Sequence, residues 1–448
     1  MVENSNVVIE QNLNMKQISQ VLASWGGWVM DGYNSIAFLL AAFYLSVIMF
    51  PPSLGYWRLV LVLAPVAFAG IGRPIGSLVL GNFIGDRVGR KALLTVSILG
   101  FSIFSASKSL LPTYAQAGIL APALLYVILF LEGIFAGAEY GAGTALALES
   151  IPKKKRSIVG AFVQSGFGTG YFLVLLAWLL IINGMTSTGI VDYAWRYLFL
   201  TTLIPGFITL LIRLTTFESS VFEDMKDKGT VARVPVKNMV TESGSKVIYA
   251  LMITTGLLFI NTATFSFWPV LASSSIHYAS FPVQLLSFSN SDILEALLII
   301  NFVSLLGVWS GGFLANWTTS RRIPMLIYAL AFSIPTAAFI YLGYSQNVAV
   351  FTLVFSIQAF LEAMIFSTLP AFLSESFSKK YRSTAIGFIY NGGALMGGFA
   401  LVLILIPTYY VSLKLVWSLE IYLAAILMIA GIYLVREKKD LKEDSILD

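Results

Sequence analysis

Four ionisable side chains inside long apolar runs of this 448-residue chain could carry chemistry. Asp31, Glu132 and Glu362 are acids, and Arg73 carries a planar guanidinium that binds carboxylates through two parallel hydrogen bonds. A carboxyl group in apolar surroundings resists ionisation, whereas a neighbouring Arg favours the charged form. An acid whose Arg partner moves, or is taken by an anion, can therefore accept a proton on one side and release it on the other. These residue types predict proton exchange, with Asp31, Glu132 and Glu362 as the proton carriers.

Other polar and aromatic side chains on the apolar runs are weaker candidates for contacts with a substrate. With Arg73, the substrate-binding candidates are Gln164, Asn261, Trp268, Gln358, Tyr390 and Asn391. Asn261 and Trp268 share one face of a helix by their spacing, and Gln358 lies one turn before Glu362. Each could equally pack in the core or face lipid. Arg73 has an open alternative too, as a structural ion pair with Asp31.

The composition requires a membrane around these residues. The chain is 57% hydrophobic and 11% charged, whereas a soluble domain carries about 25% charged residues. The apolar runs lack the ten-residue alternation of a transmembrane barrel, so helices must satisfy the backbone in lipid. Ionisable groups in such helices are costly and indicate function by default.

Several classes of chemistry are disfavoured by the residues that are missing. Cysteine is absent and His277 is the single histidine, so we expect no metal site and no cysteine nucleophile. No GxxxxGK[ST] loop for ATP occurs. We therefore expect no cofactor and no enzyme activity, and the net charge of +5 predicts membrane topology rather than nucleic-acid binding.

The apolar runs predict an all-α membrane protein of twelve transmembrane helices, arranged as two pseudo-symmetric six-helix bundles around a central cavity. A span needs roughly 20 apolar residues. The expected spans are 22–49, 58–84, 90–111, 121–148, 157–184, 195–216, 246–271, 290–315, 323–344, 347–374, 383–407 and 412–435. The domains are thus an N-terminal bundle at 1–216, a cytoplasmic linker at 217–245 and a C-terminal bundle at 246–448.

Lys and Arg collect in the loops on one side of these spans, which predicts the orientation. That side holds residues 87–91, 153–156, 321–322, 379–382 and the C-terminal tail, whereas the other side holds only Arg58, Lys108, Arg196 and Lys414. Both termini are therefore expected in the cytoplasm, in a multi-pass protein of the cell membrane that works as a monomer.

An internal repeat supports the two-bundle arrangement. "ESIPKKKRS" at 149–157 returns as "ESFSKKYRS" at 375–383, and "FLEG" at 130–133 returns as "FLEA" at 360–363. Glu132 and Glu362 are thus equivalent positions in the two halves. Parallel repeats of this kind are typical of one large class of secondary transporters.

The motifs resemble those of the major facilitator superfamily. The loop "GNFIGDRVGRK" at 81–91 is similar to that family's signature loop, and "GRPIG", "GAEYG", "GAFVQSGFGTG" and "MDGYN" resemble its metabolite:proton symporter branch, including aromatic-acid and sugar porters. Two departures stand out. Asn34 replaces the second acid of the "DGYD" motif, and Leu129 with Glu132 replaces an Arg and a Gln. A coupling role of that Arg cannot be transferred to this chain.

The resemblance implies alternating access, with spans 1, 4, 7 and 10 lining the cavity and a charged gate on the cytoplasmic side. The gate residues that it implies are Asp86, Arg87, Arg90, Glu149, Arg156, Arg213, Glu218, Arg322, Glu375 and Arg382. The basic runs beside them are also expected to contact anionic lipid.

The resulting hypothesis is proton-coupled symport of a small metabolite, most simply an organic acid because of Arg73 and "MDGYN". A porter of sugars or other neutral solutes remains an alternative, since Gln164 and Asn261 suit hydroxyl groups. A drug exporter of the same fold also remains. A non-transporting receptor or sensor is the alternative from another class, and altered gate motifs or large appended domains would favour it.

Overall fold

The computed structural model describes residues 13–85, 87–229, 235–272, 286 and 288–435. All regular elements in these residues are helices, and eleven of them are long and apolar enough to cross a membrane. A further span is the bent pair α15 (Arg322–Ser333) and α16 (Thr336–Gly343), whose axes differ by 40°. Pro335 precedes α16 and accounts for the bend, because proline cannot donate the helical hydrogen bond. The prediction of twelve spans is confirmed.

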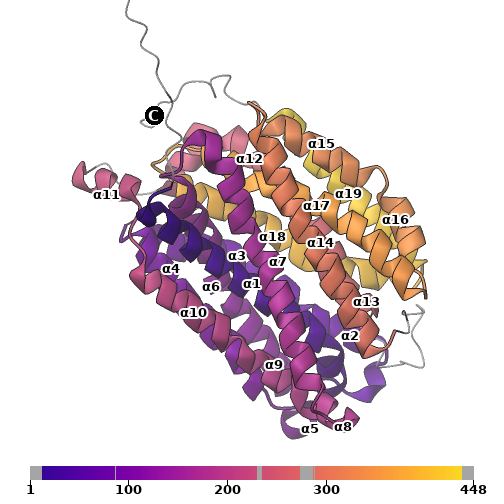
Figure 1. Cartoon of the computed structure of the whole chain (residues 1–448). Coiled ribbons are helices and arrows are strands. Elements are labelled where there is room, and N and C mark those ends of the chain that lie inside the picture. Colours follow the sequence, from indigo (N-terminus) through magenta and orange to yellow (C-terminus); the bar gives the residue numbers. More distant parts are fainter. Residues whose placement is uncertain (1–12, 86, 230–234, 273–285, 287, 436–448) are drawn as a thin grey trace, which may run out of the picture.

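The N-terminal bundle occupies one side of the molecule in Figure 1, in indigo to magenta. Its spans are α1 (Met15–Ile48), α2 (Trp57–Leu63) continued by α3 (Pro65–Leu80), α4 (Arg90–Ser107) continued by η3 (Lys108–Leu110), α6 (Leu120–Leu148), α7 (Arg156–Ile182), and α9 (Trp195–Thr201) continued by α10 (Leu203–Thr215). Short helices α5 (Tyr114–Ala117) and α8 (Ser187–Gly189) lie in its loops.

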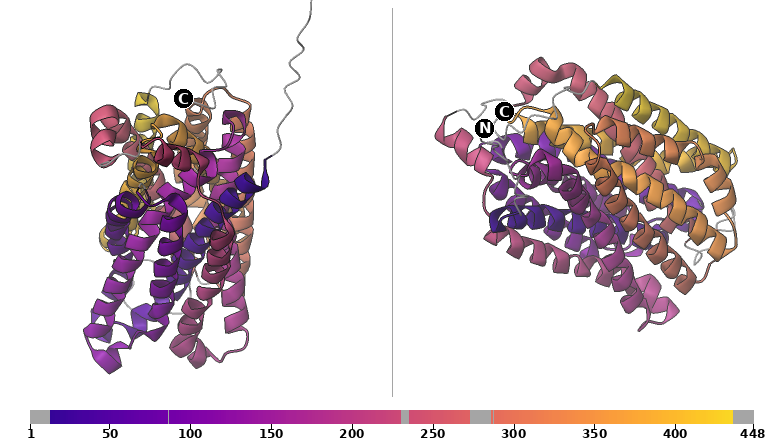
Figure 2. Two further views of the ribbon diagram at one scale, coloured as in Figure 1. Left: turned by 90° about the vertical axis from the view of Figure 1, so that its left-hand side faces the viewer. Right: turned by 45° about the horizontal axis from the view of Figure 1, so that its top comes forward.

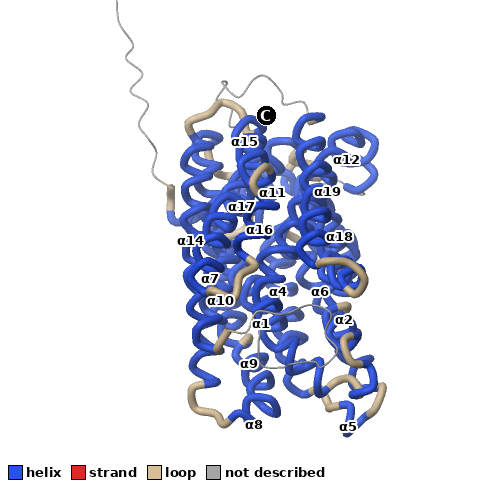
Figure 3. Tube along the Cα trace, turned by 90° about the vertical axis from the view of Figure 1, so that its right-hand side faces the viewer, coloured by secondary structure: helices blue, strands red, loops and turns tan. Residues whose placement is uncertain are grey.

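The C-terminal bundle occupies the other side, in orange to yellow. It contains α12 (Pro235–Asn261), η6 (Thr262–Ser266), α13 (Phe267–Ala272), α14 (Asn290–Asn316), α15, α16, α17 (Val348–Ser376), α18 (Arg382–Thr408) and α19 (Leu413–Leu434). The connection between the bundles carries α11 (Ser220–Asp227), which projects from the body in Figure 2. The long helices run between two ends of the molecule, where the loops gather (Figure 3).

We call one of these ends the basic end, because the described Lys and Arg residues of the loops at 87–91, 153–156, 321–322 and 379–382 lie there. Contacts across the chain support this grouping. Lys16 pairs with Glu223 at 3.2 Å, and Arg321 contacts the backbone of Lys153. We call the other end the opposite end; it holds α5, α8 and the start of α2.

Small residues let helices approach closely within and between the bundles. In the N-terminal bundle, a Cβ added at Gly133 would collide with the backbone of Ala69, and one added at Gly137 with the backbone of Arg73. Between the bundles, α18 packs on α3 and α6, and α7 packs on α14. Small-residue packing of this type is the usual way in which membrane helices associate. Here it fixes α3, and with it Arg73, against α6.

Candidate functional site

A cavity of about 180 Å³ lies between the bundles. Its walls come from α1, α3, α4, η3, α6 and α7 on one side and from α12, η6, α14, α17 and α18 on the other. Six of the predicted proton-coupling and substrate residues line it: Asp31, Arg73, Glu132, Gln164, Asn261 and Tyr390. Pockets for drug-sized ligands are commonly about 300–1,000 Å³, so this cavity suits a smaller molecule.

Asp31 and Arg73 form an ion pair inside the cavity. Nη2 of Arg73 lies 2.5 Å from Oδ1 of Asp31, and the two side chains are 16% and 7% exposed. Asp31 comes from α1 and Arg73 from α3, so the pair links two helices of one bundle. The anion-binding group predicted from sequence is thus already occupied by an internal carboxylate in this conformation.

A second buried ion pair involves Lys108, which sequence reasoning missed. Nζ of Lys108 lies 2.9 Å from Oε2 of Glu132 and 2.8 Å from Oδ1 of Asn34, and the lysine is fully buried. The Asn34 amide donates to the other oxygen of Glu132, and the Ser105 hydroxyl donates to that oxygen at 3.2 Å. Lys108 and Asn34 also line the cavity.

The sequence placed Lys108 near the end of the span at 90–111 without a partner, and Arg73 was the one cation expected near the three acids. The second expectation was wrong. The physical reason is that η3 extends α4 by one turn, and Lys108, its first residue, lies beside Glu132 of α6. A signal was present in the sequence: an acid such as Glu132 inside an apolar run needs a compensating cation nearby.

Glu362 lies in a different environment from the other two acids. It is fully buried, and it accepts hydrogen bonds from the Asn261 amide at 3.1 Å and the Thr264 hydroxyl at 2.6 Å. No Lys or Arg of the described residues forms an ion pair with it. Glu362 does not line the cavity, but Asn261 does. The Asn261 amide therefore connects the acid to the cavity.

The Thr264 hydroxyl also lies 2.9 Å from the carbonyl oxygen of Ile260, although it has a single hydrogen to donate. A protonated Glu362 can donate to Thr264 while Thr264 donates to Ile260, and this arrangement satisfies both oxygens. The hydrogen-bond geometry therefore accommodates the neutral form of the acid. The π-helical turn η6 positions Thr264 for this contact, as such turns often do at functional sites.

Three predicted substrate residues do not line the cavity. Trp268 packs between Phe265 and Phe355, with ring centroids 4.8 and 5.3 Å away. Gln358 is fully buried, and neither polar atom of its amide has a hydrogen-bond partner among the described residues. Asn391 donates to the backbone of Gly137 at 2.7 Å, so it ties α18 to α6 across the interface.

Tyr390 lies at the contact between the bundles. Its ring stacks on Tyr140 of α6 at 3.6 Å and meets the edge of Trp28 of α1 at 5.5 Å. Trp28 and Tyr390 both line the cavity, so this aromatic contact between the bundles forms part of its wall.

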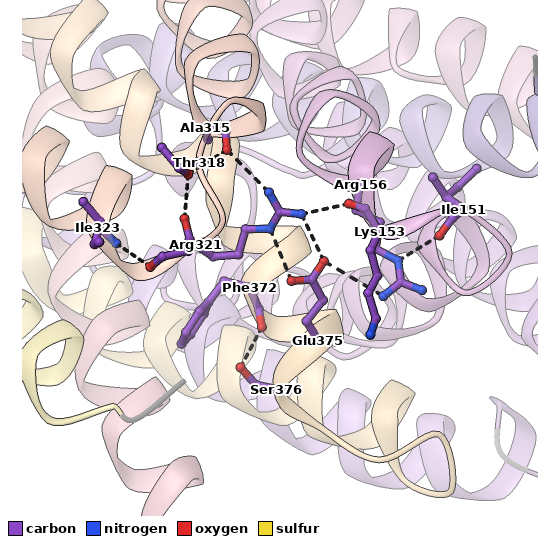
Figure 4. A network of polar contacts seen from close by, with 11 residues as sticks. Ile151, Lys153, Arg156, Ala315, Thr318, Arg321, Ile323, Phe372, Glu375 and Ser376 are labelled. Carbon is purple, nitrogen blue, oxygen red and sulfur yellow. Dashed lines mark hydrogen bonds and ion pairs between the residues drawn. The ribbon is translucent and has the colours of Figure 1, made fainter. Parts of the chain in front are cut away.

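At the basic end, Glu375 joins the two bundles (Figure 4). Arg321 lies 3.2 Å from Glu375 through Nε, and Arg156 of the N-terminal bundle lies 4.0 Å from the same carboxylate. Arg321 also donates to the backbone oxygen of Lys153 at 2.8 Å, which is a second contact between the bundles. The position expected for Arg322 is thus held by Arg321, and Arg322 instead donates to the Tyr433 backbone.

A network centred on two acids contains four further predicted gate residues: Arg90, Glu149, Glu218 and Arg382. Arg90 lies 3.6 Å from Glu149, which also accepts from the Ser219 hydroxyl, and Arg382 interacts electrostatically with Glu149 and Glu375. Glu218 accepts from two backbone N–H groups at the start of α4, where a carboxylate is favoured.

Gly89, with φ of +148°, precedes α4, and a Cβ there would collide with Glu218. Arg213 pairs with Glu139 inside the N-terminal bundle. The Arg87 guanidinium lies 5.1 Å from the Phe83 ring centroid, and Asp86 lies outside the described residues.

Two six-helix bundles that enclose a cavity with buried ionisable groups define a secondary transporter rather than an enzyme. Residues 32–401 match the model of the Major Facilitator Superfamily. The chain belongs to the major facilitator superfamily.

Relatives and solved structures agree with this assignment. The inner membrane metabolite transport protein YhjE of Escherichia coli (strain K12) is 32% identical over 345 residues, which cover 75% of this chain and 74% of that protein. A protein of Staphylococcus aureus (strain COL), which is named as a proline/betaine transporter by inference, is 31% identical over 220 residues. These residues cover 48% of this chain and 47% of that protein.

The proton:xylose symporter XylE, solved with 6-bromo-6-deoxy-D-glucose, superposes with a TM-score of 0.73 at 17% identity and covers 93% of this chain and 94% of that chain. At this identity the likeness shows the fold alone.

The contacts of Glu375 generate a prediction about the basic end. Glu375→Gln removes the carboxylate that attracts Arg321 and Arg156, so the bundles should separate there more often. A change of about 1–3 kcal/mol in the equilibrium between conformations is typical of such linkage. Because the chain has no cysteine, spin labels can be placed at Lys154→Cys and Lys380→Cys, two exposed positions on opposite bundles.

The distance distribution between the labels should shift to longer values in Glu375→Gln protein. Glu223→Gln is the matched control, because its ion pair with Lys16 is exposed and does not join the bundles. An identical distribution in wild-type and Glu375→Gln protein would show that Glu375 does not hold the basic end closed.

Proposed function

We propose that this transporter carries a small organic acid together with protons, by alternating access. The observation that supports this most is the Asp31–Arg73 pair in the wall of the cavity. When Asp31 takes a proton, it no longer neutralises Arg73, and the guanidinium becomes available to a carboxylate of the substrate. Binding of the anion and of the proton then favour each other, which is the requirement for symport.

In this proposal the two bundles, 1–216 and 246–448, rock against each other about the cavity, and the connection 217–245 lies in the cytoplasm. The basic end is the cytoplasmic end, as the Lys and Arg bias indicates, and its network around Glu375 and Glu149 closes that side. The protein resides in the cell membrane with both termini in the cytoplasm, and one chain contains the whole path.

Glu132 and Glu362 are the further proton-carrying positions in the proposal. Glu132 resembles Asp31, because each acid is paired with a cation at the cavity. Glu362 is buried among neutral partners, which favours its protonated form in this conformation. Asn261 would transmit a change in Glu362 to the substrate, because it contacts the acid and lines the cavity.

A neutral solute rich in hydroxyl groups is the second candidate. Oε1 of Gln164 and Oδ1 of Asn301 are buried acceptors without a partner among the described residues, and both side chains line the cavity. Hydroxyl groups of a sugar would supply the missing donors. In that case Arg73 would remain paired with Asp31 when the substrate binds.

Proton coupling predicts how reconstituted protein responds to pH. Uptake of an organic acid into liposomes should accelerate when the outside is made acidic relative to the inside, and a protonophore should abolish the acceleration. Liposomes without protein control for passive entry of the neutral acid. Uptake through the protein that ignores both the gradient and the protonophore would contradict symport and leave a facilitator.

The role of Arg73 can be separated from a purely structural one. Arg73→Gln leaves Asp31 buried without a partner, which costs about 3–5 kcal/mol where the acid stays ionised. The melting temperature should therefore fall at neutral pH and fall less at acidic pH, where Asp31 can be protonated. Asp31→Asn combined with Arg73→Gln should restore the melting temperature, because neither charge is left alone.

Binding gives the decisive comparison for this pair. Arg73→Lys retains the charge but loses the planar two-pronged donor, so affinity for the acid should fall while the melting temperature stays close to wild type. The double variant should regain stability without regaining affinity. Wild-type affinity for an organic acid in Arg73→Gln protein would exclude Arg73 from the site and favour the neutral solute.

A further inference from the structure

Two cations, not one, lie in the wall of the same cavity. Among the described lining residues, the basic side chains are Arg73 and Lys108, and the acidic ones are Asp31 and Glu132. Each cation contacts one acid, at 2.5 Å for Arg73 with Asp31 and 2.9 Å for Lys108 with Glu132. Arg73 and Glu132 also attract each other electrostatically, so the four groups form one cluster of alternating charge.

The charges of this cluster balance in the conformation described here. With both acids ionised, two negative charges offset two positive charges. With both acids protonated, the cluster carries two positive charges inside a low-dielectric wall. A monoanion cancels one of them and leaves the other buried without a partner, which is unfavourable. A dianion cancels both.

We propose that the substrate is a small dicarboxylate, with one carboxylate on Arg73 and the other on Lys108. This inference rests on the proposed organic-acid symport and names its substrate class. Asp31 and Glu132 each take up one proton as their cations change partner, so two protons accompany one dianion and the loaded site gains no net charge.

Lys108 has partners besides Glu132, as a binding group must have. Its ammonium lies 2.8 Å from Oδ1 of Asn34 and 4.9 Å from the centre of the Phe199 ring. Both contacts favour a cation, and the ring contact involves no atom of Glu132. The other polar groups of the cavity wall are uncharged amides and hydroxyls, such as Gln164, Asn301 and Ser304. The cavity wall therefore offers charged partners for two carboxylates and no more among the described lining residues.

The test compares acids that differ in one carboxylate. Binding of butyrate and succinate, of pentanoate and glutarate, and of hexanoate and adipate is measured by titration calorimetry at one pH. The diacid of the best-fitting pair should bind at least about tenfold more tightly than its monoacid, as expected for an added charge-assisted hydrogen bond. Repeating the titration in buffers of different ionisation enthalpy should show uptake of about two protons with the diacid and one with the monoacid.

The double variant Lys108→Gln with Glu132→Gln removes one cation–acid pair without stranding a buried charge. It should keep the melting temperature close to wild type and lose the preference for the diacid over the monoacid, together with one of the two protons. Lys414→Gln is the matched control, because this lysine contacts the Tyr341 backbone at the opposite end and does not line the cavity.

The outcomes separate this inference from the function on which it rests. Equal affinity of wild-type protein for mono- and diacids, or an unchanged diacid preference in the double variant, would overturn the dicarboxylate and leave organic-acid symport standing. Failure of every acid to bind wild-type protein would overturn both. A loss of diacid preference in Lys414→Gln as well would show a non-specific effect of charge and would also overturn the role of Lys108.

Discussion

Charge buried between helices is tolerated when an opposite charge lies beside it, and this constraint organises the N-terminal bundle. Four buried or partly buried acid–base pairs occur there among the described residues: Asp31–Arg73, Glu132–Lys108, Glu139–Arg213 and Glu149–Arg90. Each pair joins two different helices, and breaking one by removing a single partner leaves the other charge stranded. In the proposed mechanism, the property that makes such a pair costly to break also makes it a switch, because a proton or an anionic substrate takes the place of one partner.

The two bundles are unequal in this respect. Glu362 occupies the position that corresponds to Glu132, yet its described partners are the neutral Asn261 and Thr264. The C-terminal bundle thus presents amides and aromatic rings to the cavity, whereas the N-terminal bundle presents charges. Between them lie close contacts of small residues, such as Gly141 with Gly387, which bring the two backbones together. At the basic end, contacts of Arg321 and Glu375 hold the two surfaces together.

Much of this architecture could be predicted from the sequence, because span length and the placement of Lys and Arg follow directly from the physics of the bilayer. Asp31, Arg73 and Glu132 could be singled out for the same reason, since ionisable groups in apolar runs are rare.

The pairing of Lys108 with Glu132 could not be predicted, because one turn at the end of α4 decides whether a lysine reaches a loop or the interior. The sequence assigned the gate contact to Arg322, whereas Arg321 makes it. Adjacent residues at a helix start point in directions about 100° apart, so an error of one residue changes the partner. Gln358 and Asn391 were placed near the cavity by their position along the chain, but the rotation of α17 and α18 turns them into helix contacts.

The central claim is that an anionic substrate takes Arg73 from Asp31 as Asp31 takes a proton. Infrared difference spectroscopy of the purified protein, with and without the organic acid, measures this step directly, because a protonated carboxyl group absorbs apart from a carboxylate. The account predicts that substrate addition at neutral pH increases the protonated-carboxyl band of the protein. It further predicts that this substrate-induced increase is smaller in Asp31→Asn protein than in wild-type protein. In Glu223→Gln protein the increase should equal that of wild-type protein. Tight binding with no change in that band, or with the same change in Asp31→Asn protein, would contradict the claim.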